Sequence, residues 1–508
     1  MVYVILGQTA SGKTELACRL ARELNLPLIG ADAFQVYNEL NIGSAKPTEE
    51  ELEGIRHHLI GSNSIKDEFN VKIYQEECRK LLDYYQSAGQ DVILSGGTFL
   101  YVKAALYPYD FSEEDKPDDN LDSLTYEELN SILKKEDYKT YQVIDNNNLR
   151  RVIRAIRMAR SGKLKSEVKM IPQKLMYPAK FFVIKTDVAE GNKRIEKRVE
   201  AMFENGLISE VKELVKNNDS SLQAFQAIGY KEVIKGLASC QSEEEIKEQI
   251  KIDTRQYAKR QRTFLRHQFK NLIEASSDDI YNYVKYDFQR RKRNRISIPI
   301  PTLLKIEKAN VVLIGLGGVG SIVASGLVRL GVNHLTVIDK DSVETSNLNR
   351  QILYTRSDIG IKKAEACRNH LLEIDPYLDI RSVVDFYKDE YISSDTDFVF
   401  DCIDDVKAKA SIVLNCKRIG VRFICATGSG LRRDSTKFRI GNLFLTGEPL
   451  AKVFKKELSL RGFTDYEGVN VIYSSEVPLK RLDKEIGSNV ISPNSEGLGM
   501  LSFFLGQI

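Results

Sequence analysis

Two strand–glycine loop–helix starts, about 300 residues apart, constrain this chain more than any other feature. The first runs from an apolar strand at Val2–Leu6 into a glycine loop at Gly7–Lys13, and the second from Val311–Ile314 into Gly315–Gly320. Each arrangement is typical of the first βα unit of a parallel sheet. The two loops differ in kind, so they do not form an internal repeat. A chain of 508 residues exceeds one ordinary core, and we therefore expect two α/β domains.

The composition favours a water-soluble globular protein over a membrane or secreted one. Hydrophobic residues make up 42% and charged residues 29% of the chain. No apolar run reaches the roughly 18 residues that a membrane span needs, and no cleavable leader precedes the first strand, so we expect a cytoplasmic location without membrane contact. None of the seven cysteines forms a Cys-x-x-Cys pair, which argues against both a disulfide framework and a zinc site.

Domain boundaries can be placed from charge and turn residues. Residues 110–122 are acidic and turn-rich, and we expect a helical insertion at about 110–150 within a first domain at 1–275. Residues 276–308 lose periodicity, become basic and end in a proline-rich turn, so we expect a linker there and a second domain at 309–508. Residues 255–308 carry 14 Lys/Arg against 5 Asp/Glu, a balance that suits phosphate backbones. For Arg290–Arg295, a solvated linker remains an equal alternative.

The first glycine loop matches the G-x-x-x-x-G-K-[ST] pattern of a P-loop. Its backbone amides can surround phosphate oxygens, and the following helix adds a favourable field. Lys13 is expected to reach the outer phosphates and Thr14 to bind Mg²⁺. The first domain is therefore predicted to be a P-loop NTPase-like parallel sheet. The expected phosphate-binding residues are Gly7, Gln8, Thr9, Ala10, Ser11, Gly12, Lys13 and Thr14.

Five further segments indicate what carries the phosphates. With the P-loop, they resemble the tRNA dimethylallyltransferase family across residues 1 to about 272. A small-molecule P-loop kinase is the main alternative, and the segments Gln226–Lys231 and Thr254–Gln261 argue against it. The segments are Ala31–Tyr37, Gly43–Thr48, Gly96–Tyr101, Gln226–Lys231 and Thr254–Gln261.

The resemblance implies transfer of a dimethylallyl group from dimethylallyl diphosphate to the exocyclic amine of adenosine 37 in tRNA. It assigns Asp32 as the general base for the amine proton, which requires hydrogen-bond reach. Thr9 and Thr98 match positions near the reacting groups. Arg194 and Arg198 match an R-I-x-x-R segment in which an arginine steadies the leaving group, and we expect Arg194 in that role.

The same resemblance implies that the first domain binds the anticodon stem-loop of tRNA. Basic side chains position the backbone, and the target adenine must leave its stack to meet Asp32. Three departures from the family pattern stand out: Gln8 replaces the usual proline, Ala33 replaces the usual serine, and the insertion is short. The expected tRNA contacts are Asp32, Ala33, Phe34, Gln35, Arg150, Arg151, Arg154, Gln226, Gly229, Tyr230, Lys231, Arg255, Lys259 and Arg260.

The second glycine loop has the G-x-G-x-x-G spacing of a dinucleotide site, followed by Asp339 at the end of the next strand. The segments that follow are Asp339–Val343, Ser346–Gln351, Gly360–Glu365, Asp375–Pro376 and Asp401–Asp405. They resemble the ATP-using adenylating fold of the ubiquitin-activating superfamily, so a Rossmann-like adenylating domain is expected. The resemblance places Asp339 on the ribose, Arg350 and Lys363 on the triphosphate, and Asp404 on Mg²⁺, with Arg350 also catalytic. The expected ATP contacts are Gly315, Gly317, Gly318, Gly320, Asp339, Asp341, Asn347, Arg350, Gln351, Lys363 and Asp404.

A later run, Gly447–Leu458 and Val471–Glu476, resembles the tRNA threonylcarbamoyladenosine dehydratases. That family activates the carboxylate of the modified adenosine 37 with ATP and closes it to a ring, and its members dimerise, so a homodimer through this half is expected. The arginine-rich helix that usually opens the domain is replaced by Leu303–Ile306. Two alternatives remain: adenylation of a sulfur-carrier or ubiquitin-like tail, and a non-catalytic nucleotide-binding module. We further hypothesise that Arg290–Arg293 and Arg295 dock the tRNA substrates of both halves.

Overall fold

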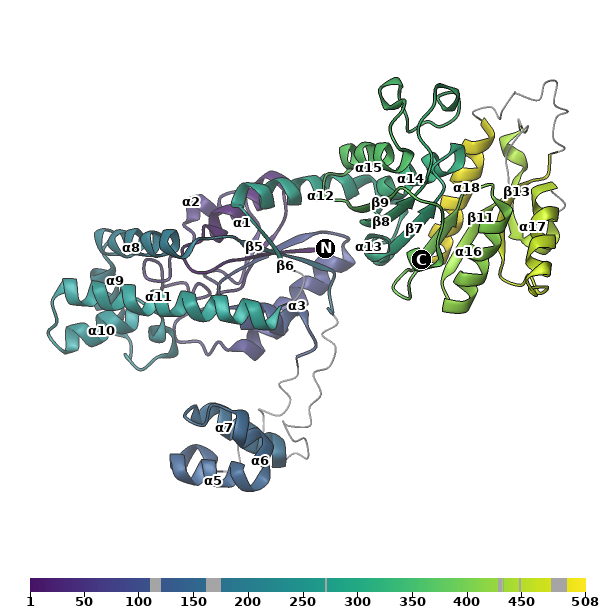
Figure 1. Cartoon of the computed structure of the whole chain (residues 1–508). Helices are drawn as coiled ribbons and strands as arrows, with labels where there is room; N and C mark the ends of the chain where they lie inside the picture. The colour runs from purple at the N-terminus through teal and green to yellow at the C-terminus, as the bar shows by residue number, and fades with distance from the viewer. Residues whose placement is uncertain are drawn as a thin grey trace. The chain divides into compact units, whose positions relative to one another are not determined.

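The chain folds into two compact units, Met1–Phe288 and Gln289–Ile508. The computed structural model describes residues 1–109, 120–160, 175–269, 272–427, 432, 434–446, 449–476 and 491–508. Both units are α/β, as the glycine loops predicted (Figure 1). Among the described helices, none has the length and apolar character that crossing a bilayer demands.

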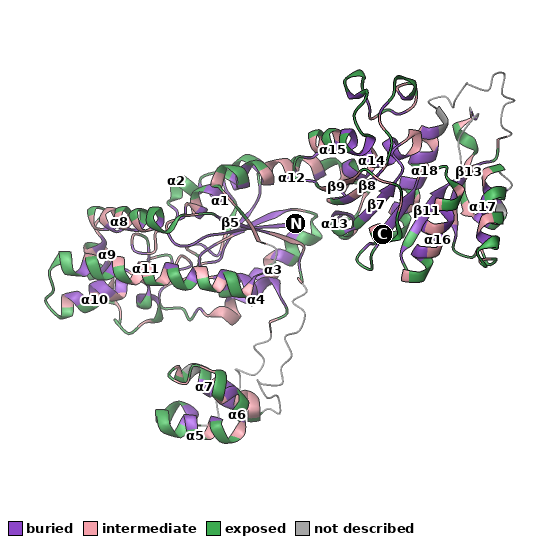
Figure 2. Ribbon diagram, viewed as in Figure 1, coloured by how far each residue is buried: buried purple, intermediate pink, exposed green. Residues whose placement is uncertain are grey.

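The first unit contains a six-stranded sheet in which every pairing is parallel. The strand order is β3-β2-β4-β1-β5-β6, and Val4 of the central strand pairs with Leu94 on one side and Phe181 on the other. All five residues of β1 are buried, as expected for a parallel strand covered on both faces (Figure 2). The strands are β1 (Val2–Leu6), β2 (Leu28–Gly30), β3 (His57–His58), β4 (Val92–Ser95), β5 (Ala179–Ile184) and β6 (Leu272–Ala275).

Helices connect these strands and complete the core of the first unit. Local caps set several of their starts: Asn70 accepts two backbone amides at the start of α3, and Ser242 forms a capping box with Glu245 at the start of α11. The helices are α1 (Lys13–Leu24), α2 (Glu49–Leu52), α3 (Val71–Ser87), α4 (Phe99–Leu106), α8 (Val188–Glu204), α9 (Leu207–Asn217), α10 (Tyr230–Ala238) and α11 (Glu243–Gln268).

The expected insertion is helical and has a small core of its own. It contains α5 (Tyr126–Glu136), α6 (Tyr138–Val143) and α7 (Leu149–Arg160), so its helices continue past the expected limit at 150. Its entrance, residues 110–119, lies outside the described residues. Apolar side chains at the spacing of one helix face let α5 and α7 bury a shared stripe. The buried residues are Leu121, Leu129, Leu133, Val152, Ile153, Ala155 and Ile156.

The second unit contains a seven-stranded sheet in the order β12-β13-β11-β10-β7-β8-β9. All pairings are parallel except that between β12 and β13. The glycine loop leaves β7, which lies between β10 and β8, so the carboxyl ends of three neighbouring strands meet beside it. The strands are β7 (Asn310–Ile314), β8 (His334–Ile338), β9 (Asp379–Val383), β10 (Phe398–Asp401), β11 (Arg422–Ala426), β12 (Phe438–Asn442) and β13 (Asn470–Ser474).

Two apolar clusters surround this second sheet. One contains Phe398, Phe400 and Phe504, whose rings pack at centroid distances of 4.9 to 5.7 Å. The other contains Val399, Phe423 and Phe454. Strand residues 398 and 400 thus face one cluster and residue 399 the other, as the two-residue period of a strand requires. The helices are α13 (Ile300–Lys308), α14 (Gly318–Leu330), α15 (Lys363–Ile374), α16 (Val406–Ile419), α17 (Pro449–Leu460) and α18 (Ile491–Gln507).

The segment expected to be a basic linker contains α12 (Ser277–Ser297) and α13. The two compact units divide within α12, after Phe288. Pro299 is the N-cap of α13, and Pro301 lies in its first turn, where proline is tolerated because the amide that it lacks would have no partner within the helix.

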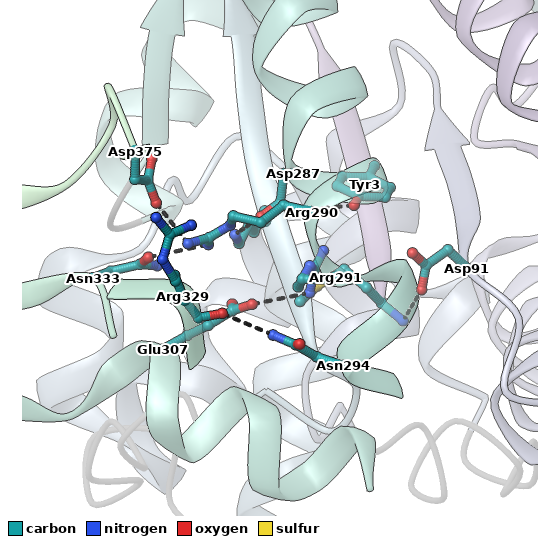
Figure 3. A network of polar contacts seen from close by, with 12 residues as sticks. Tyr3, Asp91, Asp287, Arg290, Arg291, Asn294, Glu307, Arg329, Asn333 and Asp375 are labelled. Carbon is teal, nitrogen blue, oxygen red and sulfur yellow. Dashed lines mark hydrogen bonds and ion pairs between the residues drawn. The ribbon is translucent and has the colours of Figure 1, made fainter. Parts of the chain in front are cut away.

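Two arginines of the basic segment are engaged inside the second unit (Figure 3). Arg291 is 2% exposed and lies 3.2 Å from the buried Glu307, and Arg290 lies 2.6 Å from Asp375. A buried guanidinium paired with a carboxylate cannot reach a phosphate backbone without breaking that pair. This corrects our hypothesis for these two positions, because Arg290 and Arg291 hold the second unit together instead of presenting free charge.

Candidate active site and candidate nucleotide site

The P-loop joins β1 to α1 and closes tightly on itself. A Cβ atom at Gly7 would lie 2.3 Å from Ser11 Oγ, so any other residue there would require the Ser11 side chain to move. Lys13 is buried at the start of α1. Burial lowers its pKa to about 8, with Asp32 opposing this shift and Arg198 adding to it. A cationic amine with little water around it is a strong site for the outer oxygens of a diphosphate.

Asp32 follows β2, and Thr98 follows β4, the neighbouring strand of the sheet. The Oδ1 atom of Asp32 accepts the backbone amides of Phe34 at 3.1 Å and Gln35 at 3.4 Å. The hydroxyl oxygen of Thr98 accepts the backbone amide of Ala33 at 3.0 Å. These bonds join the two strand ends and fix the orientation of the Asp32 carboxylate.

Arg194 and Arg198 lie one turn apart on α8 but have different surroundings. Arg198 is half-buried and directs its guanidinium to the hydroxyl of Thr9, at 3.4 Å, and to the carbonyl oxygen of Ser44, at 3.3 Å. Burial lowers the pKa of Arg198, and Asp32 opposes that shift. Arg194 is exposed, forms an ion pair with Glu190 at 2.5 Å, and reaches only the carbonyl oxygen of Ser11. Arg198, which sequence reasoning ranked second, is therefore the arginine next to Asp32.

A cavity of about 240 Å³ brings Thr9, Asp32 and Arg198 together with several expected tRNA contacts. Residues from far along the chain complete its wall, because α10 and α11 pack against the loops that follow β1 and β2. Arg198 also lines a larger cavity, of about 960 Å³, with Lys46 and His57. The expected tRNA contacts that line the smaller cavity are Asp32, Phe34, Gln226, Lys231 and Arg260.

Other residues expected to contact tRNA form hydrogen bonds or an ion pair within the first unit. Tyr230 is fully buried; its hydroxyl donates to Glu210 at 2.5 Å and accepts the amide of Gly43. Burial raises the pKa of Tyr230, and the adjacent Glu210 raises it further. Tyr230 therefore supports the Gly43 loop and is inaccessible to RNA, which corrects its assignment. The Gln35 amide donates to the Ala45 carbonyl, and Arg255 pairs with Glu196 at 2.8 Å.

The remaining expected contacts lie on exposed or half-buried positions. Arg151 is exposed and Arg154 half-buried on α7, whose apolar side faces the core of the insertion. The side chain of Arg150 lies outside the described ones. Lys259 is exposed on α11, and Gly229 begins α10 by donating its amide to Glu232 at 2.7 Å. Arg151 and Lys259 are exposed on the surface of the first unit, where a nucleic acid could contact them.

In the second unit, the glycine loop lies between β7 and α14. A Cβ atom at Gly320 would lie 1.8 Å from the carbonyl oxygen of Gly315, so no other residue fits. Asp339, at the end of β8, accepts the amide of Leu316 at 2.7 Å and that of Asp341 at 2.8 Å. The carboxylate thereby fixes the loop and keeps lone pairs that a ribose hydroxyl could use.

A cavity of about 790 Å³ lies at this loop and collects the predicted ATP contacts. Gly320 alone among them is not in the wall, because it packs against Gly315. Arg350 is fixed by hydrogen bonds to Ser346 O and Asn349 Oδ1, both at 2.9 Å. The predicted contacts in the wall are Gly315, Gly317, Gly318, Asp339, Asp341, Asn347, Arg350, Gln351, Lys363 and Asp404.

Sequence reasoning missed a buried ion pair beneath this cavity. Asp401 ends β10, and its Oδ2 lies 2.8 Å from Lys409 Nζ of α16, with both side chains fully buried. Although burial alone lowers the pKa of Lys409, Asp401 raises it above its ordinary value. The pair holds the strand end that leads into Asp404. A lysine four residues after an N-cap aspartate gives no sequence signal, because its partner is known only once α16 packs on β10.

Comparisons with known proteins agree with both halves of the chain. The IPP transferase family model matches residues 35–268, and the ThiF family model matches residues 291–444. A tRNA dimethylallyltransferase of Exiguobacterium sibiricum is 39% identical over 282 residues, which cover 54% of this chain and 89% of that protein.

Solved structures include relatives of each half. A tRNA isopentenylpyrophosphate transferase from Staphylococcus epidermidis is 32% identical, covering 57% of this chain and 99% of that one, with a TM-score of 0.43. The tRNA N6-threonylcarbamoyladenosine dehydratase of E. coli, solved with AMP, is 27% identical, covering 44% of this chain and 94% of that one, with a TM-score of 0.42. The chain therefore belongs to the tRNA dimethylallyltransferase family through its N-terminal half and carries a ThiF-like domain in its C-terminal half.

Proposed function

We propose that the first unit transfers a dimethylallyl group from dimethylallyl diphosphate to the N6 amine of adenosine 37 in tRNA. The observation that carries this proposal is the cavity in which the Asp32 carboxylate faces the P-loop, with Thr9 and Arg198 beside it. The relatives' common name supports the same reaction. The segments at 226–231 and 254–261, which resemble the family's tRNA motifs, line this cavity and favour the transferase over a small-molecule kinase.

Different residues would act on the leaving group, which is the diphosphate, and on the nucleophile, which is the adenine amine. The P-loop amides and Lys13 bind the diphosphate, and Arg198 neutralises charge that develops as the allylic C–O bond breaks. Magnesium, when bound through Thr14, would add to that neutralisation. The adenine amine forms the new N–C bond, and Asp32 accepts the proton that the amine loses. Pyrophosphate leaves with the electron pair of the broken bond.

The proposed binding of the target base depends on the remaining wall of the cavity. Phe34 offers a ring for stacking, and Lys231 and Arg260 offer cations at its edge. An adenine must leave its stack to enter a cavity of about 240 Å³ that closes around one base. Arg151 and Arg154 of the insertion, with Lys259, would contact the backbone of the anticodon stem-loop.

The test of this proposal is dimethylallyl transfer from labelled diphosphate to a tRNA transcript. Asp32→Asn keeps the shape of the side chain but removes the proton acceptor, and it should lower the rate by about 100-fold or more. Asp219→Asn, at an exposed aspartate of the same unit, serves as the matched control. Transfer by Asp32→Asn at the rate of Asp219→Asn would contradict the role of Asp32, and absence of transfer by the unaltered chain would contradict the function.

We further propose that the second unit is an ATP-dependent tRNA threonylcarbamoyladenosine dehydratase. Support comes from the cavity at the glycine loop, from the ThiF family match, and from the absence of the Cys-x-x-Cys pairs common in tail-activating relatives. The substrate carboxylate would attack the α-phosphorus of ATP and release pyrophosphate, and ring closure would then release AMP. Arg350 and Lys363 would bind the phosphates, and Asp404 would hold magnesium. A homodimer through this unit is part of the proposal.

Pyrophosphate exchange into ATP separates this proposal from its two alternatives. Exchange stimulated by tRNA that carries threonylcarbamoyladenosine, and not by a peptide ending in Gly-Gly, is the expected result. Stimulation by the peptide alone would favour tail adenylation. No exchange with either substrate, together with retained ATP binding, would favour a non-catalytic module. Arg350→Ala should abolish the exchange, whereas Arg356→Ala, at an exposed arginine outside the cavity wall, should leave it intact.

A further inference from the structure

The side chain of Gln261, on α11, joins the two loops that form the active site of the first unit. Its Oε1 atom accepts the backbone amide of Thr9 at 2.8 Å, and its Nε2 atom donates to the carbonyl oxygen of Gly97 at 2.8 Å. The residue is 4% exposed, so water cannot replace either bond. Because one bond needs an acceptor and the other a donor, only one orientation of this amide satisfies both.

The first bond of Gln261 fixes the P-loop. Thr9 is held at its amide by Gln261 and at its hydroxyl by Arg198, so the residue is tied to α11 and to α8. The amide of Thr9 is thereby withdrawn from phosphate binding, and the Ser11 amide is also engaged within the loop, since it donates to the Gln8 carbonyl oxygen at 3.2 Å. The bond between Thr9 and Gln261 spans 252 positions of the chain, which means that the shape of the P-loop depends on a helix formed near the end of the unit.

The second bond of Gln261 fixes the loop after β4. Gly97 precedes Thr98, whose hydroxyl accepts the amide of Ala33 next to Asp32. A Cβ atom at Gly97 would lie 3.0 Å from Gln261 Nε2 and 3.2 Å from Asp32 Oδ2, so the backbone there is tightly enclosed. The Tyr257 hydroxyl, one turn earlier on α11, donates to the same carbonyl oxygen at 3.3 Å. One helix thus sets the position of the Asp32 side of the site.

The next residue of α11 makes a second bond to the P-loop. Arg262 Nη1 donates to Gln8 Oε1, and Gln8 is 5% exposed. Gly191 of α8 leaves room for this side chain, since a Cβ atom there would lie 2.4 Å from Gln8 Nε2. Gln8 is the position at which this chain departs from the family's proline. A proline offers no side-chain acceptor, so the bond from Arg262 depends on that departure.

We propose that Gln261 is a positioning residue that sets the distance between the diphosphate and the amine, and that the Gln8–Arg262 pair strengthens the same link. The inference rests on the proposed dimethylallyl transfer. Gln261 is buried and does not line either cavity, so it acts through Thr9 and Gly97 and not on the substrates. Reaction rates depend steeply on the spacing of reacting atoms, whereas ground-state binding depends on it weakly.

Steady-state kinetics of the full-length chain test the role of Gln261. Gln261→Met keeps the volume but removes both hydrogen bonds; kcat should fall about 10- to 100-fold while KM for each substrate stays within about threefold. Gln256→Met, at an exposed glutamine of the same helix, should leave kcat unchanged. A raised KM with normal kcat would show direct substrate contact, and unchanged kinetics would show no role; either result overturns the inference. An inactive unaltered chain would overturn the proposed function and this inference with it.

A second set of variants keeps the inference falsifiable if Gln261→Met fails to fold. Gln8→Met and Arg262→Met alter a buried and a half-buried position, respectively, and each should lower kcat about three- to tenfold. The double variant should lose no more than the single ones, because both remove one shared bond. Losses that multiply in the double variant, or single variants with unaltered kcat, would refute the contribution of this pair.

Discussion

The guanidinium of Arg198 lies 3.4 Å from the hydroxyl of Thr9, whereas Arg194, one turn earlier on the same helix, pairs with Glu190. Arg198 therefore lies where the P-loop, the Ser44 carbonyl and the Asp32 cavity meet. A cation at that place can neutralise both the departing diphosphate and the carboxylate that accepts the proton.

This arrangement predicts unequal effects of two conservative substitutions. Arg198→Lys should lower kcat/KM for dimethylallyl transfer about 10- to 100-fold, because lysine cannot reach Thr9 and Ser44 together. Arg194→Lys, its matched control, should change kcat/KM by less than about threefold, because Arg194 mainly forms an exposed pair. The opposite order of effects would return the leaving-group role to Arg194.

The lowered pKa of Lys13 predicts a pH dependence of diphosphate binding. Lys13 carries its positive charge below pH 8 and loses it as the pH rises through that value. The affinity of the unliganded protein for inorganic pyrophosphate should therefore weaken above about pH 8, as measured by calorimetric titration. Lys13→Met should bind pyrophosphate weakly at every pH and lack this inflection. An affinity that stays constant between pH 7 and 9.5 would contradict the assignment.

The buried pair of Lys409 and Asp401 predicts a large effect on stability. Lys409→Met leaves Asp401 buried without its partner and should lower the free energy of unfolding of the second unit by about 3–5 kcal/mol. Lys407→Met, at an exposed lysine two residues earlier, should change it by less than about 0.5 kcal/mol. Denaturant unfolding of the full chain, followed through loss of ATP binding, measures both. Equal midpoints for the two variants would mean that the pair contributes nothing.

The close approach at Gly320 predicts loss of nucleotide binding from one added methyl group. Gly320→Ala would place a carbon 1.8 Å from Gly315 O, so the glycine loop must move and the cavity must change shape. ATP binding to the full chain should weaken at least about tenfold, whereas Gly506→Ala, with open space around its Cβ position, should bind normally. Normal binding by Gly320→Ala would show that the loop does not contact the phosphates.

The two glycine loops could be predicted from the sequence because the residues that define each of them are close together in the chain. The amides of Gly7–Thr14 come from consecutive residues, and the close contact of Gly320 with Gly315 spans only five positions. Asp32 and Thr98 were assigned through the resemblance to the tRNA dimethylallyltransferase family, and each follows a short apolar strand. The same resemblance put Arg194 before Arg198 for the leaving-group role, whereas Arg198 is the one that lines the cavity. Residues four apart share a helix face, so only tertiary packing decides which of them faces the cavity.

Residues whose partners are remote in sequence were the ones that prediction misjudged or missed. Tyr230 lies in a segment that resembles an RNA-binding motif, yet Glu210 and Gly43 bury it. Arg291 belongs to a basic run that composition assigns to RNA, yet it pairs with Glu307. Gln261 gave no signal of its own, because its partner in the P-loop is 252 residues away.

The order of apolar runs, glycine loops and charged motifs by itself determined two α/β domains, the glycine loop that opens each of them, the tRNA dimethylallyltransferase family of the N-terminal half and the ThiF-like character of the C-terminal half. Tertiary structure decided which side chains meet: Arg198 with Thr9, Gln261 with Gly97, and Lys409 with Asp401. The physical reason is that backbone conformation follows from neighbouring residues. Burial and pairing of a charged or polar side chain depend instead on elements that come together only when the sheet and its helices are complete.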